Sequence, residues 1–497
     1  MQQSERFPFL GLGEYPMVIG DRKVTSRTLR PTYDPATGAE IGRAYLAGPE
    51  EVDQAVSSAQ NAFRAWSRMP AAQREKLMHR YADAIEENAE ELALIDTLDN
   101  GAPLSNTRGG VARAVEQMRY YAGWATKITG ETIAPSRPHD AYFAYTLRQP
   151  VGVVAAITPW NSPVVNMMLK VTAALAAGCA VVVKPSELTP LSALRLAELA
   201  LDAGLPPGLV CVIPGDGAVA GQALAEHRGI AKVSFTGSTE VGRKIVDAAK
   251  NRMARLTLEL GGKSPNIVFD DVDIDTVVPQ AAWATFRNSG QICVAGSRLF
   301  VQAKIYDAFL ERLATFTRSV KVGNGLDPES QMGPLISGRQ ADRVEEYVNG
   351  GVADGATLIA GGRRLRDAER PTGQFFEPTV IADVRPDIRI VREEVFGPVT
   401  VVSRFDGIDE AIEAANRTEY GLAAGLWTGS LSTAHRVAAN VHAGMIWVNC
   451  YGQYDPALPF GGHKLSGVGA KSGHEAVLDC TELKTVVMSL GGESPRS

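Results

Sequence analysis

Apolar positions recur every three or four residues between residues 50 and 126, for example over residues 74–98. This spacing predicts a helical region in the N-terminal part of the chain. After Pro150 the pattern changes to short, nearly continuous apolar runs that alternate with helical segments. The runs cover residues 151–157, 180–183, 210–213 and 232–235. Strands of this kind are typical of a parallel sheet that helices cover on both faces. The pattern therefore predicts a doubly wound α/β domain.

A second alternation follows the Gly261-Gly262 pair. Predicted strands cover residues 266–269, 298–301, 399–402 and 445–448, and predicted helices cover 273–288, 304–319, 337–353, 408–415 and 431–441. The fold class that follows is α/β, with two doubly wound domains in one chain.

Two more strand patterns lie outside both alternations. Residues 141–147, within the insert 128–149, alternate like an edge strand, and residues 483–488 near the C-terminus are similar. Strands left over from both sheets predict a small β arm that pairs between the subunits of a homo-oligomer. The open alternative is a hairpin that packs on its own chain.

Composition narrows the class of protein. A chain of 497 residues exceeds one ordinary core, and 45% hydrophobic with 21% charged residues is typical of a globular enzyme. The net charge of −6 provides no basic surface for nucleic acid or anionic lipid. Residues 1–9 lack the cationic region and apolar run of a signal peptide. No apolar run reaches the roughly 18 residues of a membrane span, so we expect a cytoplasmic protein.

The cysteines carry the first chemical signal. They are scattered, without a CxxC pair or an adjacent histidine, which argues against a disulfide framework and against a metal site: Cys179, Cys211, Cys293, Cys450 and Cys480. Cys293 ends the segment FRNSGQIC, a small, polar turn next to glycine. Such a turn offers backbone N–H groups and room for a substrate, so Cys293 is a candidate nucleophile. A packed, inert cysteine is the local alternative.

Two other polar residues are placed where catalysis can use them. Asn161, in the segment TPWNSP, directly follows a predicted strand, where its amide can donate to a developing oxyanion. Glu259 ends the predicted strand LTLEL and precedes two glycines, which suits a mobile general base. A turn-forming Asn and a surface Glu are the local alternatives.

Several segments favour a dinucleotide site. Lys184 and Glu187 follow a strand, where a carboxylate can accept hydrogen bonds from ribose hydroxyls. Two glycine motifs could bind the phosphates of the dinucleotide. GDGAVA at 215–220 fits the GxGxxG/A spacing, but FTGSTEVG at 235–242 opens a helix and is favoured for the phosphates. The first motif is then expected near the adenine. Glu394 and Phe396 suit a second ribose and a flat ring.

Seven motifs together resemble the NAD(P)-dependent aldehyde dehydrogenase superfamily in their order and approximate spacing, over essentially the whole chain. They are TPWNSP, VKPSE, FTGSTEVG, LELGGKSPNIV, FRNSGQIC, EEVFGPV and PFGGHKLSG. The resemblance implies Rossmann-like domains that assemble as a dimer or tetramer. It assigns residues 1–130 and 150–261 to an NAD-binding domain, 262–461 to a catalytic domain, and 131–149 with 479–497 to an oligomerisation arm and tail.

The resemblance also implies a mechanism. Cys293 would attack the aldehyde carbon to form a thiohemiacetal, and Asn161 with the backbone N–H of Cys293 would hold the oxyanion. After hydride transfer to the nicotinamide, Glu259 would activate the water that hydrolyses the thioester. Lys170, in the helix after the Asn motif, matches a family lysine that supports this region through a charge relay.

The resemblance also implies a preference for NAD over NADP, because the Glu187 carboxylate would repel a 2′-phosphate. It further implies a set of cofactor-binding residues. The set is Ile157, Thr158, Pro159, Trp160, Lys184, Glu187, Gly217, Phe235, Gly237, Ser238, Val241, Leu260, Gly261, Glu394 and Phe396. The chain departs from the family pattern at Lys471, where many relatives carry a Glu that is thought to support proton transfer.

Family substrate-pocket positions fall on Asn166, Leu169, Trp283, Arg287, Ile292 and Tyr454. Trp283 and Tyr454 favour aromatic or medium-chain aliphatic aldehydes. Arg287 matches relatives that oxidise semialdehyde acids, but Leu169 stands where those relatives tend to have a second Arg, so this class ranks second. A CoA-acylating enzyme typically lacks the Glu259 base, and a noncatalytic fold relative or a cysteine hydrolase is disfavoured by the intact Cys, Glu and cofactor motifs.

Overall fold

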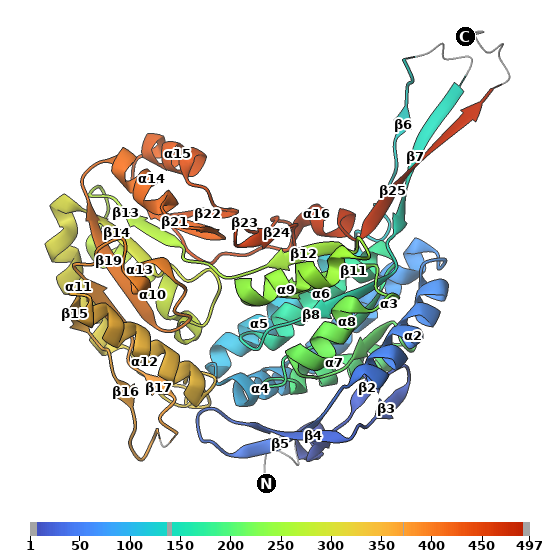
Figure 1. Cartoon of the computed structure of the whole chain (residues 1–497), viewed down its shortest axis with the longest axis horizontal. Coiled ribbons are helices and arrows are strands. Elements are labelled where there is room, and N and C mark those ends of the chain that lie inside the picture. The colour runs from blue at the N-terminus through green and yellow to red at the C-terminus, as the bar shows by residue number, and fades with distance from the viewer. Residues whose placement is uncertain (1–6, 137–141, 371, 491–497) are drawn as a thin grey trace.

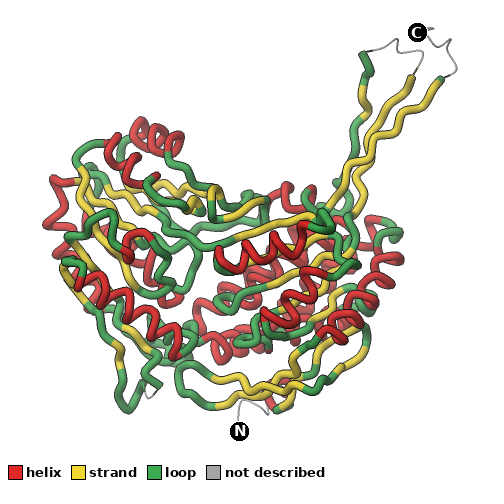
Figure 2. The backbone as a smooth tube through the Cα atoms, viewed as in Figure 1, coloured by secondary structure: helices red, strands yellow, loops and turns green. Residues whose placement is uncertain are grey.

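The computed structural model describes residues 7–136, 142–370 and 372–490. Two α/β bodies lie side by side, and a narrow β arm projects from one of them (Figure 1). The first described residues and the arm lie at opposite ends of the same body (Figure 2). None of the helices in the described residues is long and apolar enough to cross a membrane.

The first body is built on an eight-stranded sheet. In spatial order its strands are β24 (Gly467–Val468), β12 (Arg255–Glu259), β11 (Lys232–Thr236), β8 (Val153–Ile157), β9 (Ala180–Lys184), β10 (Val210–Val212), β2 (Met17–Ile19) and β3 (Arg22–Val24). The five strands from β12 to β10 are parallel, whereas β24, β2 and β3 pair antiparallel with their neighbours. Every residue of β8, β9, β10 and β11 is buried, as expected for strands that helices cover on both faces.

Helices pack on both faces of this sheet and on one another. They are α2 (Pro49–Trp66), α3 (Ala71–Glu87), α4 (Ala89–Asn100), α5 (Leu104–Ala122), α6 (Pro163–Ala177), α7 (Leu191–Asp202), α8 (Gln222–Glu226), α9 (Thr239–Lys250) and α16 (Gly473–Leu478). One buried hydrophobic cluster joins the sheet to these helices. A small sheet of β1 (Glu14–Tyr15), β5 (Glu40–Leu46) and β4 (Thr28–Tyr33) lies outside the main one.

The order of the strands locates a natural binding edge. From β8 the chain moves outward through β9 and β10, and it then returns to the other side of β8 to add β11 and β12. Loops after β8 and β11 therefore diverge at a topological switch point, the place where open α/β sheets bind ligands at the carboxyl ends of their strands.

The second body holds a seven-stranded sheet in the order β15 (Thr357–Ala360), β18 (Thr379–Ala382), β19 (Val399–Phe405), β14 (Arg298–Gln302), β13 (Pro265–Val268), β21 (Ala423–Trp427) and β22 (Met445–Val448). Only β15 runs antiparallel to its neighbour in this sheet. Its helices are α10 (Ile274–Phe286), α11 (Tyr306–Ser319), α12 (Gly338–Ala353), α13 (Arg389–Arg392), α14 (Ile408–Asn416) and α15 (Leu431–Asn440). Two-stranded antiparallel sheets pair β16 (Arg364–Leu365) with β17 (Phe375–Phe376) and β20 (Tyr420–Gly421) with β23 (His463–Lys464).

The fold class predicted from the sequence is confirmed, although several strands escaped prediction. The segment β21 reads AAGLW and lacks the β-branched residues that mark a strand, yet all five residues are buried between β13 and β22. Its conformation is set by its two neighbours in the sheet rather than by its own propensity.

The arm is a three-stranded sheet in the order β25 (Thr481–Ser489), β7 (Tyr142–Pro150) and β6 (Thr132–Ile133). The two strands predicted to pair between subunits pair with each other in one chain, over nine residue pairs, because the C-terminal segment returns along the insert. Pairing of the arm between subunits stays a prediction. Parts of the predicted arm, residues 137–141 and 491–497, lie outside the described residues.

Edge strand β24 has a direct bearing on Glu259, because Gly467 lies opposite Glu259 in the antiparallel pair. Gly467 has a φ of +137°, and a Cβ atom built there would lie 1.9 Å from the carbonyl oxygen of Leu258. Only glycine allows the two backbones to approach this closely.

We therefore expect Gly467→Ala to lower the free energy of unfolding by about 2 kcal/mol or more, since the backbone of β24 must move. Denaturant unfolding followed by circular dichroism measures the change. Gly350→Ala is the control, because Gly350 lies inside α12 with no atom within 4 Å of the added Cβ. Equal stability of the two variants would contradict the argument.

Candidate active site

Cys293 stands on an irregular turn that follows α10. Asn288 and Ser289 adopt left-handed conformations, with φ angles of 51° and 56°, directly after the helix ends. Such angles are uncommon outside glycine and Asn, and they are retained where the surrounding structure fixes them. Here the Asn288 amide donates to the backbone oxygen of Asn161 at 2.8 Å, and the Ser289 hydroxyl donates to that of Gly333 at 2.8 Å.

The end of strand β12 lies against this turn. A Cβ atom at Gly262 would lie 2.3 Å from the carbonyl oxygen of Cys293, so the second glycine after Glu259 is required for the close approach. The sequence suggested that the glycines give Glu259 mobility, whereas the structure gives them a packing role. Through this contact the first sheet brings Glu259 next to a cysteine of the second body.

Cys293 and Glu259 form the central contact of the site. The Sγ atom of Cys293 donates to Oε1 of Glu259 at 2.7 Å. Burial raises the pKa of the Cys293 thiol to about 12, and the charge of Glu394 adds to the rise, while backbone N–H groups and Lys170 oppose it. The cysteine therefore rests as a thiol next to a carboxylate that can accept its proton, rather than as a free thiolate.

Asn161 follows β8 and reaches the same turn. Its Nδ2 atom donates to the backbone oxygen of Gln291 at 2.7 Å, and the side chain is buried. An amide nitrogen carries two N–H groups, so one of them is left for an oxyanion formed at Cys293.

Two lysines lie behind Glu259. Lys170 of α6 donates to the hydroxyl of Thr236 at 2.6 Å, and Lys471, in the loop after β24, contacts both that hydroxyl and Oε2 of Glu259. Burial lowers the pKa of Lys170 to about 7, and burial together with the charge of Lys170 lowers the pKa of Lys471. The expected position of Lys170 near the base is thus observed, whereas the contact of Lys471 with the base was not foreseen.

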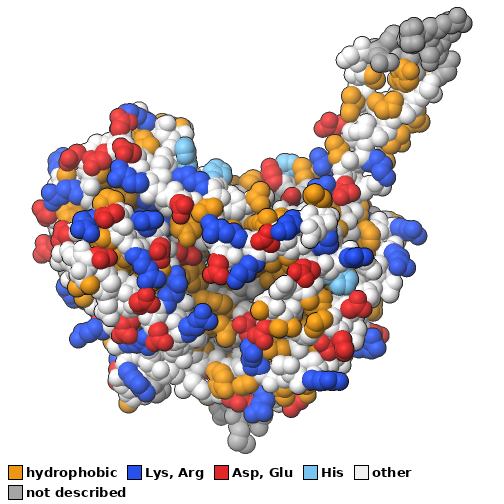
Figure 3. Space-filling view, viewed as in Figure 1, with side chains coloured by type: hydrophobic (Ala, Val, Ile, Leu, Met, Phe, Trp, Pro, Cys, Tyr) orange, Lys and Arg blue, Asp and Glu red, His pale blue; other side chains and the backbone are white. Residues whose placement is uncertain are grey.

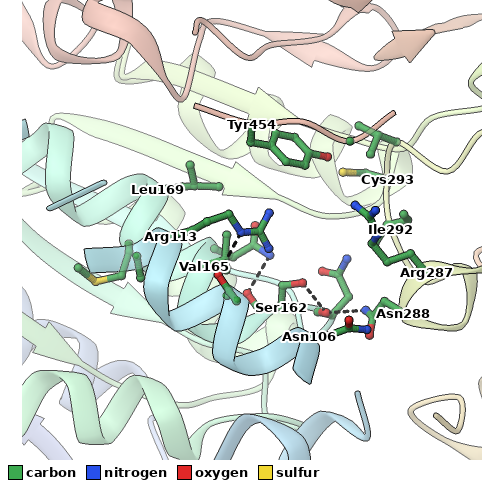
Figure 4. A pocket seen from close by; sticks show the side chains of 18 of the residues that line it. Asn106, Arg113, Ser162, Val165, Leu169, Arg287, Asn288, Ile292, Cys293 and Tyr454 are labelled. Atoms are coloured by element: carbon green, nitrogen blue, oxygen red, sulfur yellow. Dashed lines mark hydrogen bonds between the residues drawn. The ribbon is translucent and has the colours of Figure 1, made fainter. Parts of the chain in front are cut away.

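A cavity of about 530 Å³ opens onto Cys293. All six residues predicted for the substrate pocket line it, namely Asn166, Leu169, Trp283, Arg287, Ile292 and Tyr454. Asn161, Glu259 and Cys293 also belong to its wall. Figure 4 shows the Cys293 sulfur facing the space between Tyr454, Leu169 and Arg287.

Arg113 is a pocket residue that the sequence argument missed. It projects from α5, its guanidinium lies 5.6 Å from the centre of the Tyr454 ring, and it faces Arg287 from the opposite wall (Figure 4). Burial lowers the pKa of Arg113, and the charge of Arg287 adds to this effect. Within the part of the chain that the structure describes, neither guanidinium forms an ion pair. Arg113 lies in an ordinary helical pattern, so no local signal marked it.

The predicted cofactor residues gather on the carboxyl edge of the first sheet. They follow β8 (Ile157, Thr158, Pro159, Trp160), β9 (Lys184, Glu187), β10 (Gly217), β11 (Phe235, Gly237, Ser238, Val241) and β12 (Leu260, Gly261). Ser238 caps α9 by accepting from the backbone N–H of Val241 at 3.3 Å. Lys184 is buried and donates to the backbone oxygens of Pro185 and Gly215, so its Nζ atom is oriented by the chain itself.

Glu394 and Phe396 reach this edge from the second body. Oε1 of Glu394 accepts from the backbone N–H of Gly262 at 3.0 Å, and burial raises the pKa of Glu394 to about 7. The rings of Trp160 and Phe396 meet edge to face with centroids 5.4 Å apart. Glu394 and Phe396 therefore contact the loops that follow β12 and β8 in the first body.

Comparisons with known proteins agree with this arrangement. Residues 22–486 match the sequence model of the aldehyde dehydrogenase family. DhaS of Bacillus subtilis (strain 168) is 47% identical over 496 residues, which cover 99% of each chain.

Solved structures are equally similar. The NAD⁺ complex of an aldehyde dehydrogenase from Bacillus cereus has a TM-score of 0.94 and 43% identity, with 98% of each chain covered. A betaine aldehyde dehydrogenase from Staphylococcus aureus, also in complex with NAD⁺, has a TM-score of 0.95 and 36% identity over 98% of each chain. On these findings the chain belongs to the aldehyde dehydrogenase family.

Proposed function

We propose that this protein oxidises an aldehyde to the carboxylic acid, with NAD as the hydride acceptor. The observation that carries the proposal is the 2.7 Å contact between Cys293 and Glu259 at the point where the cavity meets the carboxyl edge of the first sheet. Glu259 accepts the thiol proton as Sγ bonds to the carbonyl carbon, and Asn161 with the backbone N–H of Cys293 holds the oxyanion.

The residues on the sheet edge fit a dinucleotide. The N-terminus of α9 presents backbone N–H groups for a pyrophosphate, and Glu187 at the end of β9 offers a carboxylate for the adenosine ribose. Trp160, Phe396 and Glu394 are placed for the nicotinamide half. When bound, NAD supplies the acceptor for the hydride of the thiohemiacetal. The Glu187 carboxylate favours NAD over NADP, because a 2′-phosphate would be repelled.

Glu259 then serves the second half of the reaction. Once Glu259 has released the thiol proton to solvent, Oε1 no longer faces a thiol and can accept a proton from the water that attacks the acyl carbon. A CoA-acylating reaction is disfavoured, since this base lies against the sulfur that would carry the acyl group. An assay for acyl-CoA with added coenzyme A distinguishes the two.

We expect Cys293→Ala to abolish NADH formation and Glu259→Gln to lower steady-state turnover by at least about 100-fold, because water is no longer activated. Stopped-flow absorbance at 340 nm should show that Glu259→Gln still releases up to one NADH per site in a first turnover, but more slowly than the native protein, because the thiol has lost its proton acceptor. Unchanged steady-state turnover of Glu259→Gln would remove Glu259 from hydrolysis.

The cavity walls support the substrate class. Trp283, Leu169, Ile292 and Tyr454 present apolar and aromatic surface next to Cys293, which favours aromatic or medium-chain aliphatic aldehydes. The second candidate is an aldehyde that carries a carboxylate. Arg113 favours it, because Arg113 and Arg287 face one cavity without a carboxylate partner among the described residues.

Arg113→Met and Arg287→Met test the second candidate. If the guanidiniums bind a carboxylate, each change raises KM for a straight-chain aldehyde acid about 10-fold or more, since a hydrogen bond to a charged group is lost. The uncharged aldehyde of equal length is the matched control, and its KM should stay within about two-fold. Equal effects on both substrates would assign the arginines to packing.

The arm supports assembly as a homo-oligomer, a dimer or tetramer. Leu483, Val487 and Met488 of β25 and Phe143 and Leu147 of β7 are exposed. These apolar side chains follow the projecting strands in Figure 3, while acidic and basic side chains are interspersed over the rest of that face. The register places Leu483 and Val487 on one face of the arm and Phe143, Leu147 and Met488 on the other, and exposed apolar side chains grouped in this way mark protein interfaces.

A Leu483→Asp, Val487→Asp double variant should shift sedimentation velocity profiles toward the monomer at micromolar protein, because charges would be buried in the contact. Leu431→Asp is the control, since Leu431 is 74% exposed on α15, away from the arm. An unchanged sedimentation coefficient of the double variant would exclude the arm from the contact.

A further inference from the structure

Lys471 occupies an unusual place for a buried lysine. Its side chain and that of Glu259 are 2% and 4% exposed, and the two form an ion pair. Its backbone N–H donates to the carbonyl oxygen of Phe460 at 2.9 Å, which fixes the loop that carries it. This residue is also where the chain departs from the carboxylate that many relatives carry.

The contacts of Glu259 are divided between its two oxygens. Oε2 contacts Lys471 and lies 3.4 Å from the Thr236 hydroxyl, whereas Oε1 accepts from the Cys293 thiol. A carboxylate held at one oxygen cannot rotate away without breaking a charge-assisted hydrogen bond. The ammonium of Lys471 therefore directs the other oxygen toward the sulfur.

The charged groups around Lys471 also bear on how it holds Glu259. The groups that face Lys471 are Lys170 from α6, Thr236 from β11 and Glu259 from β12. Glu394 acts on Cys293, and Lys232 acts on Lys170 from the far end of β11, where it is paired with Asp479. Lys471 contacts Glu259 directly, whereas Lys170 contacts the Thr236 hydroxyl between them. Burial and the charge of Lys170 lower the pKa of Lys471, and the carboxylate in direct contact opposes that lowering.

We propose that Lys471 is a positioning residue that holds the Glu259 carboxylate against Cys293 and, through its positive charge, sets the pH at which the thiol becomes reactive. The inference rests on the proposed function for its biological meaning. It makes a separate physical claim, because the ammonium acts on the Cys293–Glu259 pair before any substrate binds. An ammonium paired with the carboxylate next to Cys293 offsets the negative charge that a thiolate would face, and its removal leaves the thiolate facing an uncompensated carboxylate.

The rate of Cys293 alkylation by iodoacetamide, measured by mass spectrometry from pH 5 to 10, tests this claim without aldehyde or NAD. Because the pKa of the thiol is raised to about 12, these rates follow the rising limb of the profile, and a shift of the midpoint is measured as the displacement of that limb along the pH axis. Lys471→Met should move the midpoint of the profile to higher pH by at least about one unit, because the stabilising charge is lost. Lys471→Arg should leave the midpoint within about 0.3 units. Lys471→Glu, with the residue that relatives carry, should fold and should move the midpoint at least as far as Lys471→Met.

Lys232→Met provides the matched control. Lys232 is equally buried and pairs with Asp479 at the opposite end of β11, so its loss removes the same kind of ion pair without touching Glu259. It should lower stability and leave the alkylation midpoint in place. The proposal is overturned if the profiles of Lys471→Met and Lys471→Glu superimpose on the native profile, or if Lys471→Arg shifts it as far as they do.

The outcomes also separate this inference from the proposed function. Failure of the native protein to form NADH from any aldehyde would reject the function and leave the alkylation profiles interpretable. Normal aldehyde oxidation with unshifted profiles would reject the role of Lys471 alone.

Discussion

The close approach of two backbones, at Gly262 and Cys293, is the constraint on which the site depends. A single added methyl group at Gly262 would lie 2.3 Å from the Cys293 carbonyl oxygen. The end of β12 and the turn of the second body are therefore too close for any side chain at this position. That contact sets the distance between a carboxylate from one α/β unit and a sulfur from the other. Neither unit alone contains the reactive pair.

Burial of the ionisable groups in the site costs free energy, because it disfavours their charged forms, and neighbouring charges offset that cost. Glu259, Lys170 and Lys471 are buried and Cys293 is partly buried at the cavity wall, which disfavours their charged forms, and each contacts a partner that can donate or accept a proton. A dry site strengthens every one of these interactions, so moving one proton changes the field felt by the others. The reactivity of the cysteine is therefore a property of the cluster rather than of the sulfur.

The sequence predicted what depends on local pattern. Buried apolar strands and their following loops were recognisable, and because parallel strands end at one edge, residues as distant as Trp160 and Glu187 were expected to share a surface. Strand β21 was missed because its Ala and Gly residues carry no strand signal, and its neighbours impose the conformation. Arg113 and the contact between Lys471 and Glu259 could not be predicted, since each depends on how a helix or loop docks against a distant segment.

The final stretch of the chain connects parts that are otherwise separate. After β23 it leaves the second body, adds β24 to the edge of the first sheet, passes Lys471, forms α16 and reaches β25 of the arm. A single proteolytic cut in this stretch would free a sheet edge, a charged group behind the base and one arm strand together. We therefore expect no smaller fragment to be catalytic. The last thirty or so described residues join the two bodies and the arm, so a break within them would disrupt both the active site and the fold.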